Sequence, residues 1–170
     1  MPSASAVADL EPQLRSLMPV LHRFALRATR DAELSRDLAQ EALLAAVAQA
    51  PSFSGRSTLR TWVVGILSHK IIDHFRRRAT RATEGGDDAQ LLATPSPDDV
   101  ERVVAARQQL AAVDRALQTL PELERMALLL CDVEEMDRED CCRVLGVSAT
   151  HLRVLLHRGR NRLRTKLEHD

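Results

Sequence analysis

The chain has 170 residues, which is enough for one domain or for two small ones. Its 24 Lys and Arg residues balance 24 Asp and Glu residues, which excludes a uniformly basic or acidic protein. The charges nevertheless form blocks, because basic residues gather at 56–81 and 143–166 and acidic residues at 84–101 and 122–140. A neutral chain with this pattern is polarised, and its basic faces can still bind phosphate groups.

Composition also bounds the fold class and the compartment. Alanine, leucine and arginine are abundant and β-branched runs are scarce, which predicts an all-α protein. No stretch approaches the roughly 20 apolar residues of a membrane span. The N-terminus lacks a signal pattern, so we expect no membrane insertion, and the odd number of cysteines, two of them adjacent, favours a reducing cytoplasm. The three cysteines, Cys131, Cys141 and Cys142, fit no disulfide framework and leave a redox or metal role open.

The first 50 residues predict two helices. The first runs from about Leu10 to Ala28, and Pro19 is expected either to kink it or to divide it in two. Asp31 opens the second helix, which runs from Ala32 to about Gln49.

The segment 51–55 is predicted to be a loop because it is rich in Pro, Ser and Gly. Its one large apolar residue, Phe53, is expected to fold back over the helix ends. A third helix begins after Ser57 or Thr58, carries apolar residues at three- and four-residue steps, and ends in the run Arg76–Arg78. Cations suit the negative end of a helix dipole. Because the run, together with Arg81, exceeds what that role needs, two of these arginines are expected to project away from the core.

The segment 81–98 is acidic, contains Gly and Pro residues and has little periodicity. These features predict a flexible linker between a first domain at 1–80 and a second domain at 99–170. Fully extended, such a linker reaches about 60 Å. Two domains on this tether can therefore bind well apart on one DNA duplex.

The second domain is predicted to hold four helices, and the last two of them form a tight corner. One helix runs to about Leu117 and another from Glu122 to about Asp132. In the corner, Asp137 caps the first helix, Gly146 ends it in the left-handed conformation, and Ser148 caps the second.

The last helix has a divided surface. Its apolar residues share one face, and they are Leu152, Leu155, Leu156, Gly159, Leu163 and Leu167. Basic residues flank that face on both sides, and no acidic residue occurs between positions 144 and 166. A helix–corner–helix with a basic, exposed second helix is the form that enters a DNA major groove. An amphipathic helical hairpin with a solvated basic face is the alternative.

Blocks in both halves resemble one protein family. The chain is similar to bacterial sigma factors of the small, two-domain extracytoplasmic-function (ECF) group of the sigma-70 family. The matching stretches are 37–41, 53–62 and 71–78 in the first half and 120–125, 145–148 and 156–163 in the second. The resemblance covers about residues 10–168. The occurrence of both sets of motifs in this order is highly specific for the family.

The resemblance implies a sigma factor that binds core RNA polymerase and directs it to promoters. Three residues lie on the helix implied to dock on the polymerase clamp: Asp37, Gln40 and Glu41. The loop 53–58 is implied to capture a base flipped out of the −10 element. The residues implied to contact −10 DNA are Phe53, Arg56, Arg60, His69, Lys70, Asp73, Arg76, Arg77 and Arg78.

The second domain resembles the part of a sigma factor that reads the −35 element. The residues implied to bind it are Ser148, Thr150, His151, Arg153, Val154, His157, Arg158 and Arg160. Arginine bidentate to guanine is the commonest specific pairing, whereas Val154 is limited to apolar contact. Cys141 and Cys142 depart from the small apolar run usual in the first helix of this motif.

Two other classes of function fit the sequence less well. A helix-turn-helix regulator acting without polymerase needs only one DNA-binding surface, so the basic helix of the first domain speaks against it. An enzyme is disfavoured because no phosphate loop, metal-ligand spacing or nucleophile elbow occurs. We therefore expect no catalytic residue, metal or cofactor. The family resemblance further implies an anti-sigma factor as a partner.

Overall fold

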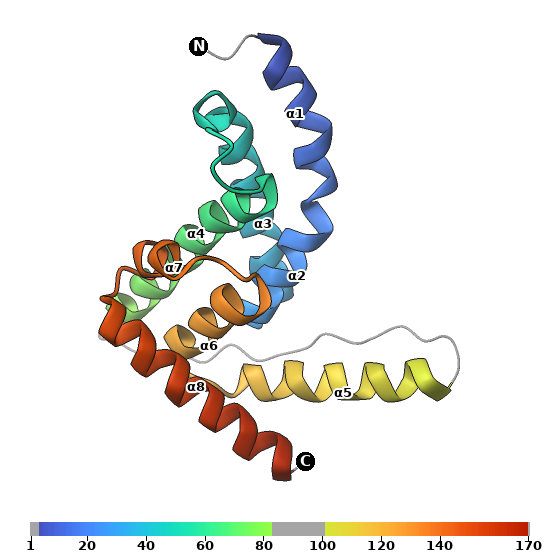
Figure 1. Ribbon diagram of the computed structural model, residues 1–170, viewed down its shortest axis with the longest axis vertical. Helices are drawn as coiled ribbons and strands as arrows, with labels where there is room; N and C mark the ends of the chain where they lie inside the picture. Colours follow the sequence, from blue (N-terminus) through green and yellow to red (C-terminus); the bar gives the residue numbers. More distant parts are fainter. Residues whose placement is uncertain (1–3, 83–100, 170) are drawn as a thin grey trace. The chain divides into compact units, whose positions relative to one another are not determined.

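The structure is a computed structural model that describes residues 4–82 and 101–169 (Figure 1). All regular elements in these ranges are helical, and they form two compact units that divide between residues 90 and 91. The predicted all-α class with two helical domains is therefore confirmed. Within the described residues, no helix is both long and apolar enough to cross a membrane.

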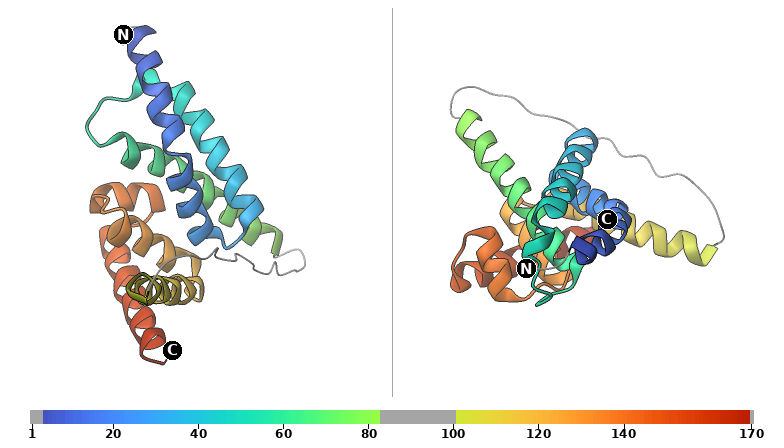
Figure 2. Two further views of the ribbon diagram at one scale, coloured as in Figure 1. Left: turned by 90° about the vertical axis from the view of Figure 1, so that its right-hand side faces the viewer. Right: turned by 90° about the horizontal axis from the view of Figure 1, so that it is seen from above.

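The first unit packs α2 against α3 and α3 against α4, as the views in Figure 2 show. Its elements are α1 (Ala4–Ser16), α2 (Met18–Thr29), α3 (Ala32–Gln49), a short 3-10 turn η1 (Ala50–Ser52) and α4 (Leu59–Ala82). Alanine makes the close packing of α2 on α3 possible, since Ala25, Ala28, Ala39, Ala42 and Ala46 are all fully buried. Small side chains let the helix axes approach, and α3 in turn supports α4.

Pro19 divides the first predicted helix into two instead of kinking it. α1 ends at Ser16, and α2 begins at Met18 with Pro19 at its second position. At that position the missing backbone N–H of proline would have no partner inside the helix anyway. The helical segment also begins earlier than the predicted Leu10, because α1 starts at Ala4.

The starts of α3 and α4 are set by local capping, as predicted. The Asp31 carboxylate accepts hydrogen bonds from the backbone N–H of Glu33 and Leu34, at 3.0 and 2.9 Å. The Thr58 hydroxyl accepts one from the N–H of Thr61 at 3.1 Å, so Thr58 fills the role that the sequence assigns to Ser57 or Thr58.

The second unit holds α5 (Glu101–Gln118), α6 (Glu122–Leu128), the π-helical turn η2 (Leu129–Val133), α7 (Arg138–Leu145) and α8 (Ala149–His169). The predicted α-helix from 122 to 132 is wrong in its last turn. The N–H of Glu134 bonds the carbonyl of Leu129 at 3.0 Å, which is the i→i−5 spacing of a π-turn. Leu128, Leu129 and Leu130 are all buried, so neighbouring elements enclose this segment on more than one side.

The predicted linker, 81–98, lies outside the described residues except for positions 81 and 82. Those two residues continue α4, so the third helix runs slightly beyond the predicted domain end at residue 80.

Candidate nucleic-acid interface

The corner between α7 and α8 is built by three local interactions. The Asp137 carboxylate accepts a hydrogen bond from the Glu139 N–H at 2.8 Å and begins α7. Gly146 ends α7 with φ of 65°, which L-residues rarely adopt. The Ser148 hydroxyl accepts from the His151 N–H at 3.1 Å and begins α8. All three predicted corner residues therefore act as the sequence indicated.

α8 packs closely on α6 through its apolar face. Leu152, Leu155 and Leu156 are buried. A Cβ atom added to Gly159 would lie 3.1 Å from Leu128 Cδ1, so glycine permits this close approach. At the C-terminal end of this face Leu167 is 39% exposed, because α8 extends beyond the core there.

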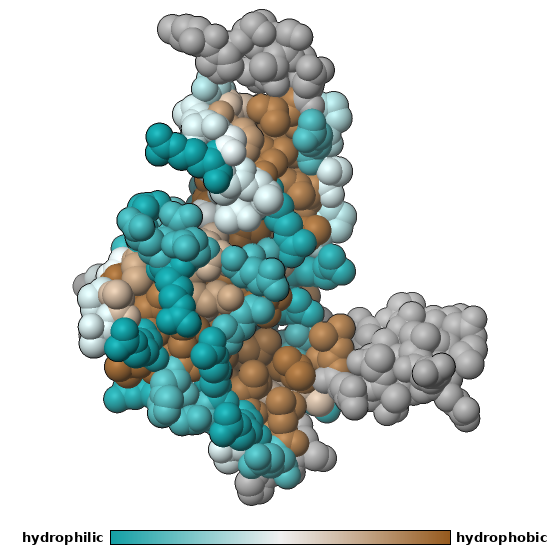
Figure 3. Space-filling view, in the orientation of Figure 1, coloured by the Kyte–Doolittle hydropathy of each residue, from teal (hydrophilic) through white to brown (hydrophobic). Residues whose placement is uncertain are grey.

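The opposite face of α8 is exposed and basic. Figure 3 shows hydrophilic side chains along this helix on the side turned to the viewer. The structure places all of the predicted −35 residues in the exposed class: Ser148, Thr150, His151, Arg153, Val154, His157, Arg158 and Arg160. Packing of the leucine face thus determines that these eight side chains are available for contact with DNA.

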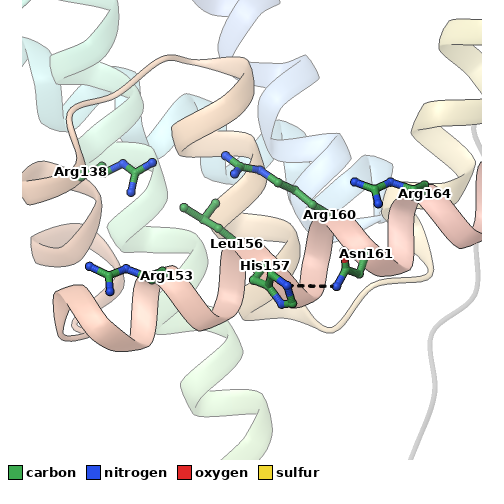
Figure 4. A pocket seen from close by; sticks show the side chains of 7 residues that line it. All are labelled: Arg138, Arg153, Leu156, His157, Arg160, Asn161 and Arg164. Carbon is green, nitrogen blue, oxygen red and sulfur yellow. Dashed lines mark hydrogen bonds between the residues drawn. The ribbon is translucent and has the colours of Figure 1, made fainter.

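A hollow of about 470 Å³ lies on this face between α7 and α8 (Figure 4). Its lining residues are Arg138, Arg153, Leu156, His157, Arg160, Asn161 and Arg164. Within it, the side-chain nitrogens of His157 and Asn161 lie 3.4 Å apart. Four guanidinium groups around one hollow favour a polyanionic ligand such as a DNA backbone. Arg138 comes from α7 and was not among the predicted residues, because only the packing of α7 on α8 brings it here.

Two arginines of α8 bind acidic residues of their own unit. Arg160 donates two hydrogen bonds to the Asp132 carboxylate, at 2.9 and 2.6 Å. This bidentate pair raises the pKa of Arg160 above its ordinary value. A guanidinium nitrogen of Arg162 lies 3.3 Å from the buried carboxylate of Glu124. Both pairs anchor α8 to the segment 124–132.

In the first unit, the three predicted polymerase-docking residues, Asp37, Gln40 and Glu41, lie exposed on α3. The Glu41 carboxylate also forms an ion pair with Lys70 of α4, at 3.2 Å. A residue expected to contact polymerase is thereby joined to one expected to contact −10 DNA. The two predicted surfaces are adjacent on this unit.

The predicted base-capture loop packs on the start of α4. The ring centroids of Phe53 and Trp62 lie 5.1 Å apart with a tilt of 41° between the planes. Phe53 is half-buried, whereas Arg56 and Arg60 are exposed. Gly55 has φ of 69°, so the sharp turn between them needs a residue that tolerates the left-handed region. The aromatic contact fixes this loop against α4.

The C-terminal half of α4 presents the remaining predicted −10 residues. His69, Asp73, Arg76, Arg77 and Arg78 are exposed. Arg76 lies 3.8 Å from the Asp73 carboxylate, and the Arg78 guanidinium lies 5.8 Å from the ring centre of Phe75. These are exposed contacts that DNA phosphates can replace at small energetic cost. The structure therefore brings the predicted −10 residues together on one loop and one helix.

Comparisons with known proteins match both units. The family model described as Sigma-70 region 2 matches residues 14–81, and the model described as Sigma-70, region 4 matches residues 110–163. The chain is 32% identical over 136 residues to the ECF RNA polymerase sigma factor SigC of Mycobacterium tuberculosis, covering 79% of this chain and 70% of that protein. It is 26% identical to the RNA polymerase sigma factor YlaC of Bacillus subtilis, covering 94% of this chain and 92% of that protein.

A solved structure has a similar fold. It is the sigma factor RpoE of Bartonella quintana, in complex with the anti-sigma factor NepR, with a TM-score of 0.74. The sequences are 24% identical, and the match covers 95% of this chain and 98% of that one. Family membership decides against a regulator that acts without polymerase and against an enzyme, because a sigma factor is a non-catalytic polymerase subunit. The chain belongs to the ECF group of the sigma-70 family, with a region 2 domain and a region 4 domain.

Proposed function

We propose that this sigma factor reads the −35 element with the exposed face of α8, reads the −10 element with the loop 53–58 and α4, and docks on core polymerase through α3. The observation that carries the proposal is the position of the −35 residues, all exposed on one basic helix whose opposite face is buried. A recognition helix in a major groove requires this division.

At the −35 element, four residues are proposed to reach base edges: Arg153, Val154, His157 and Arg158. Ser148, Thr150 and His151 lie at the start of α8, where backbone N–H groups and the helix dipole also favour phosphate. Arg160 of the −35 set is held by Asp132, so it is proposed to fix the position of α8 beside the DNA backbone rather than to read a base.

At the −10 element, Phe53, Arg56 and Arg60 of the loop and its junction with α4 are proposed to hold a base removed from the stack. Extracting a base costs a few kcal/mol of stacking, so the pocket must compensate by stacking and hydrogen bonding. His69, Lys70 and Asp73 follow along α4. Arg76, Arg77 and Arg78 are proposed to bind phosphates and to position the strand.

The docking surface on polymerase is proposed to be Asp37, Gln40 and Glu41, which are exposed on neighbouring turns of α3. We also propose domain limits of 1–80 and 99–170, joined by the linker 81–98; in support, the two compact units divide between residues 90 and 91, within that linker. Such a linker allows the two domains to bind separate promoter elements.

An anti-sigma factor is proposed as a further partner. The similar Bartonella quintana sigma factor was solved with one bound. Such a partner is expected to cover the α3 or α8 surface and so to compete with polymerase or promoter. Addition of the partner should therefore lower the fraction of this chain that co-migrates with core polymerase. Simultaneous binding of both partners with transcription unchanged would contradict this proposal.

The central test is reconstitution with core polymerase and selection of promoters from a random DNA library. The wild-type holoenzyme is expected to enrich two separated elements. A double variant, Asp37→Ala with Glu41→Ala, is expected to lose polymerase association while the chain still binds the selected −35 duplex. Loss of both activities together would instead indicate misfolding, and loss of neither would contradict the assignment of α3.

A further inference from the structure

Two cysteines of the region 4 domain meet inside the helix-turn-helix unit. Cys131 lies in η2 and Cys141 in α7, and their Sγ atoms are 2.9 Å apart. We propose that Cys131 and Cys141 form a redox modification site, at which a peroxide converts the two thiols into a disulfide that links α7 to the segment after α6. The residues proposed to contact DNA and polymerase include neither thiol.

The geometry favours a bond between these two sulphurs. A disulfide places the sulphurs about 2.05 Å apart, so they need to approach by only about 0.9 Å from the 2.9 Å of the reduced state. η2 and α7 already pack against each other. The Cys141 sulphur also lies 3.5 Å from the Met136 carbonyl, which holds it on the side of α7 that faces η2. The two sulphurs therefore already lie in contact before oxidation.

Exposure and electrostatics assign a different role to each thiol. Cys131 is half-buried and accessible to a small oxidant, whereas Cys141 is fully buried. The hydrogen bond with Cys141 lowers the pKa of Cys131, and the charges of Arg138 and Arg160 act in the same direction, against burial and Asp132. The same hydrogen bond and burial raise the pKa of Cys141. Because the thiolate is the reactive form, Cys131 reacts with peroxide and Cys141 then reacts with Cys131.

The proposed reaction has two steps. The Cys131 thiolate attacks one oxygen of hydrogen peroxide, so an S–O bond forms, the O–O bond breaks, and hydroxide leaves and is protonated to water. The Cys141 sulphur loses its proton and attacks the resulting sulfenic acid, so the S–S bond forms and a second water leaves. Overall, two thiols and one peroxide give one disulfide and two waters, with two electrons passing to the peroxide. A dithiol reductant reverses the bond by exchange.

The alternative of a metal site is not supported by the described residues, in which no cluster of three or more His, Cys, Asp or Glu side chains is placed to hold an ion. A structural zinc site takes four such ligands. Cys142 provides a natural control, since it follows Cys141 directly and lies about 100° further round α7. Cys141 and Cys142 therefore project in different directions from α7, although they are adjacent in the sequence.

The disulfide is expected to stabilise the domain without altering its DNA-binding face. Cys131 precedes Asp132, which holds Arg160 of α8, so the new bond joins the parts of the domain that support the recognition helix. The exposed face of α8 lies on a different side of that helix from its buried leucines. Because that face determines the affinity, the affinity for a −35 duplex is expected to change by less than about twofold on oxidation.

The test uses the full chain, treated with hydrogen peroxide, alkylated and mapped by mass spectrometry of its peptides. We expect the wild-type chain and Cys142→Ser to form the Cys131–Cys141 link with position 142 unlinked, and to reach a higher urea midpoint when oxidised. Cys131→Ser and Cys141→Ala are expected to form no such link and to show no oxidation-dependent shift.

Three results would overturn the proposal. They are a link from Cys131 to Cys142, oxidation of Cys131 without any intramolecular link, or a linked wild-type chain whose midpoint does not rise. Because these readouts come from the wild-type chain, they hold even where a variant fails to fold. The reference is the chain unfolded in urea and then treated with peroxide. There Cys131 is expected to link to Cys141 and to Cys142 without preference.

Discussion

Arg153 and Arg160 lie two turns apart on the same helix, but their surroundings differ. Both side chains line the hollow between α7 and α8, but Arg160 in addition forms a bidentate pair with Asp132. A guanidinium that already has a carboxylate partner must exchange it when it meets a phosphate, so its net gain on DNA binding is smaller. At the scale of single residues, an acidic neighbour therefore decides which arginines of α8 are available to read DNA and which fix the position of α8.

Substitution of the base-reading arginines should relax promoter choice. Arg153→Ala and Arg158→Ala are each expected to lower −35 affinity by about 1–3 kcal/mol and to weaken preference at one base position. The measurement is competition binding of the holoenzyme to single-base promoter variants. Arg115→Ala, which removes an exposed arginine of α5, is the matched control and should leave affinity unchanged. Unchanged affinity in both α8 variants would disprove this assignment of the recognition face.

Release of Arg160 from its pair with Asp132 should raise the affinity for −35 DNA. Asp132→Asn removes the charge that holds Arg160, and since the pair is partly exposed, stability should fall by no more than about 1 kcal/mol. The freed guanidinium is expected to bind about one additional phosphate and to steepen the dependence of log K on log salt by about 0.9. Glu139→Gln, an exposed carboxylate on α7, controls for the change in net charge. Equal salt slopes for the two variants would contradict this role of Asp132.

At the scale of elements, the corner of the helix-turn-helix depends on one glycine. Gly146 has φ of 65°, and an L-residue in that region costs roughly 1–2 kcal/mol. The turn sets the angle between α7 and α8, so strain there acts directly on the recognition helix. Gly65 in α4 is a useful contrast, because a Cβ atom added there meets no neighbour within 4 Å.

The same substitution at these two glycines should change stability in opposite directions. Gly146→Ala is expected to lower the free energy of unfolding by about 1–2 kcal/mol. Gly65→Ala should raise it by about 0.5–1 kcal/mol, since alanine is the better residue in a helix interior. Urea unfolding of each variant, followed by circular dichroism, measures both values. A stabilising Gly146→Ala would show that the left-handed corner is absent.

At the scale of the whole molecule, two domains are proposed to read separate promoter elements through one chain. Each domain buries its own core, and each presents cationic side chains to solvent. Binding through two tethered domains strengthens overall association without requiring contact between them. Their contributions should therefore be separable by mutation.

Neutralising the end of α4 should affect promoter activity without affecting −35 binding. The triple variant of Arg76, Arg77 and Arg78 to Ala is expected to reduce transcription for all promoters and to lower the salt slope by as much as about 0.9 for each phosphate that is no longer bound. The free chain should still bind a −35 duplex with wild-type affinity. Run-off transcription and duplex binding measure the two effects. A parallel loss of −35 binding would contradict the division between the domains.

The sequence alone predicted the features that depend on residues two to four positions apart in the chain. Asp31, Asp137 and Ser148 cap helices, and Gly146 ends one, because each acts on backbone groups of its own turn. Apolar spacing likewise predicted which face of α8 is buried, except at Leu167, where the core ends before the helix does. Family motifs supplied the function because they occur in both halves in the expected order.

Tertiary structure decided the contacts between distant positions. The pairs Lys70–Glu41 and Arg160–Asp132 join residues 29 and 28 positions apart, and no local pattern indicates them. The π-turn at Leu129–Val133 and the meeting of Cys131 with Cys141 arise in the same way. A local signal specifies the period and the ends of a helix, but the rotation and depth at which helices pack determine which side chains meet. For that reason the basic face of α8 could be predicted from the sequence, whereas the acidic partners of its arginines and the pairing of Cys131 with Cys141 could be seen only in the fold.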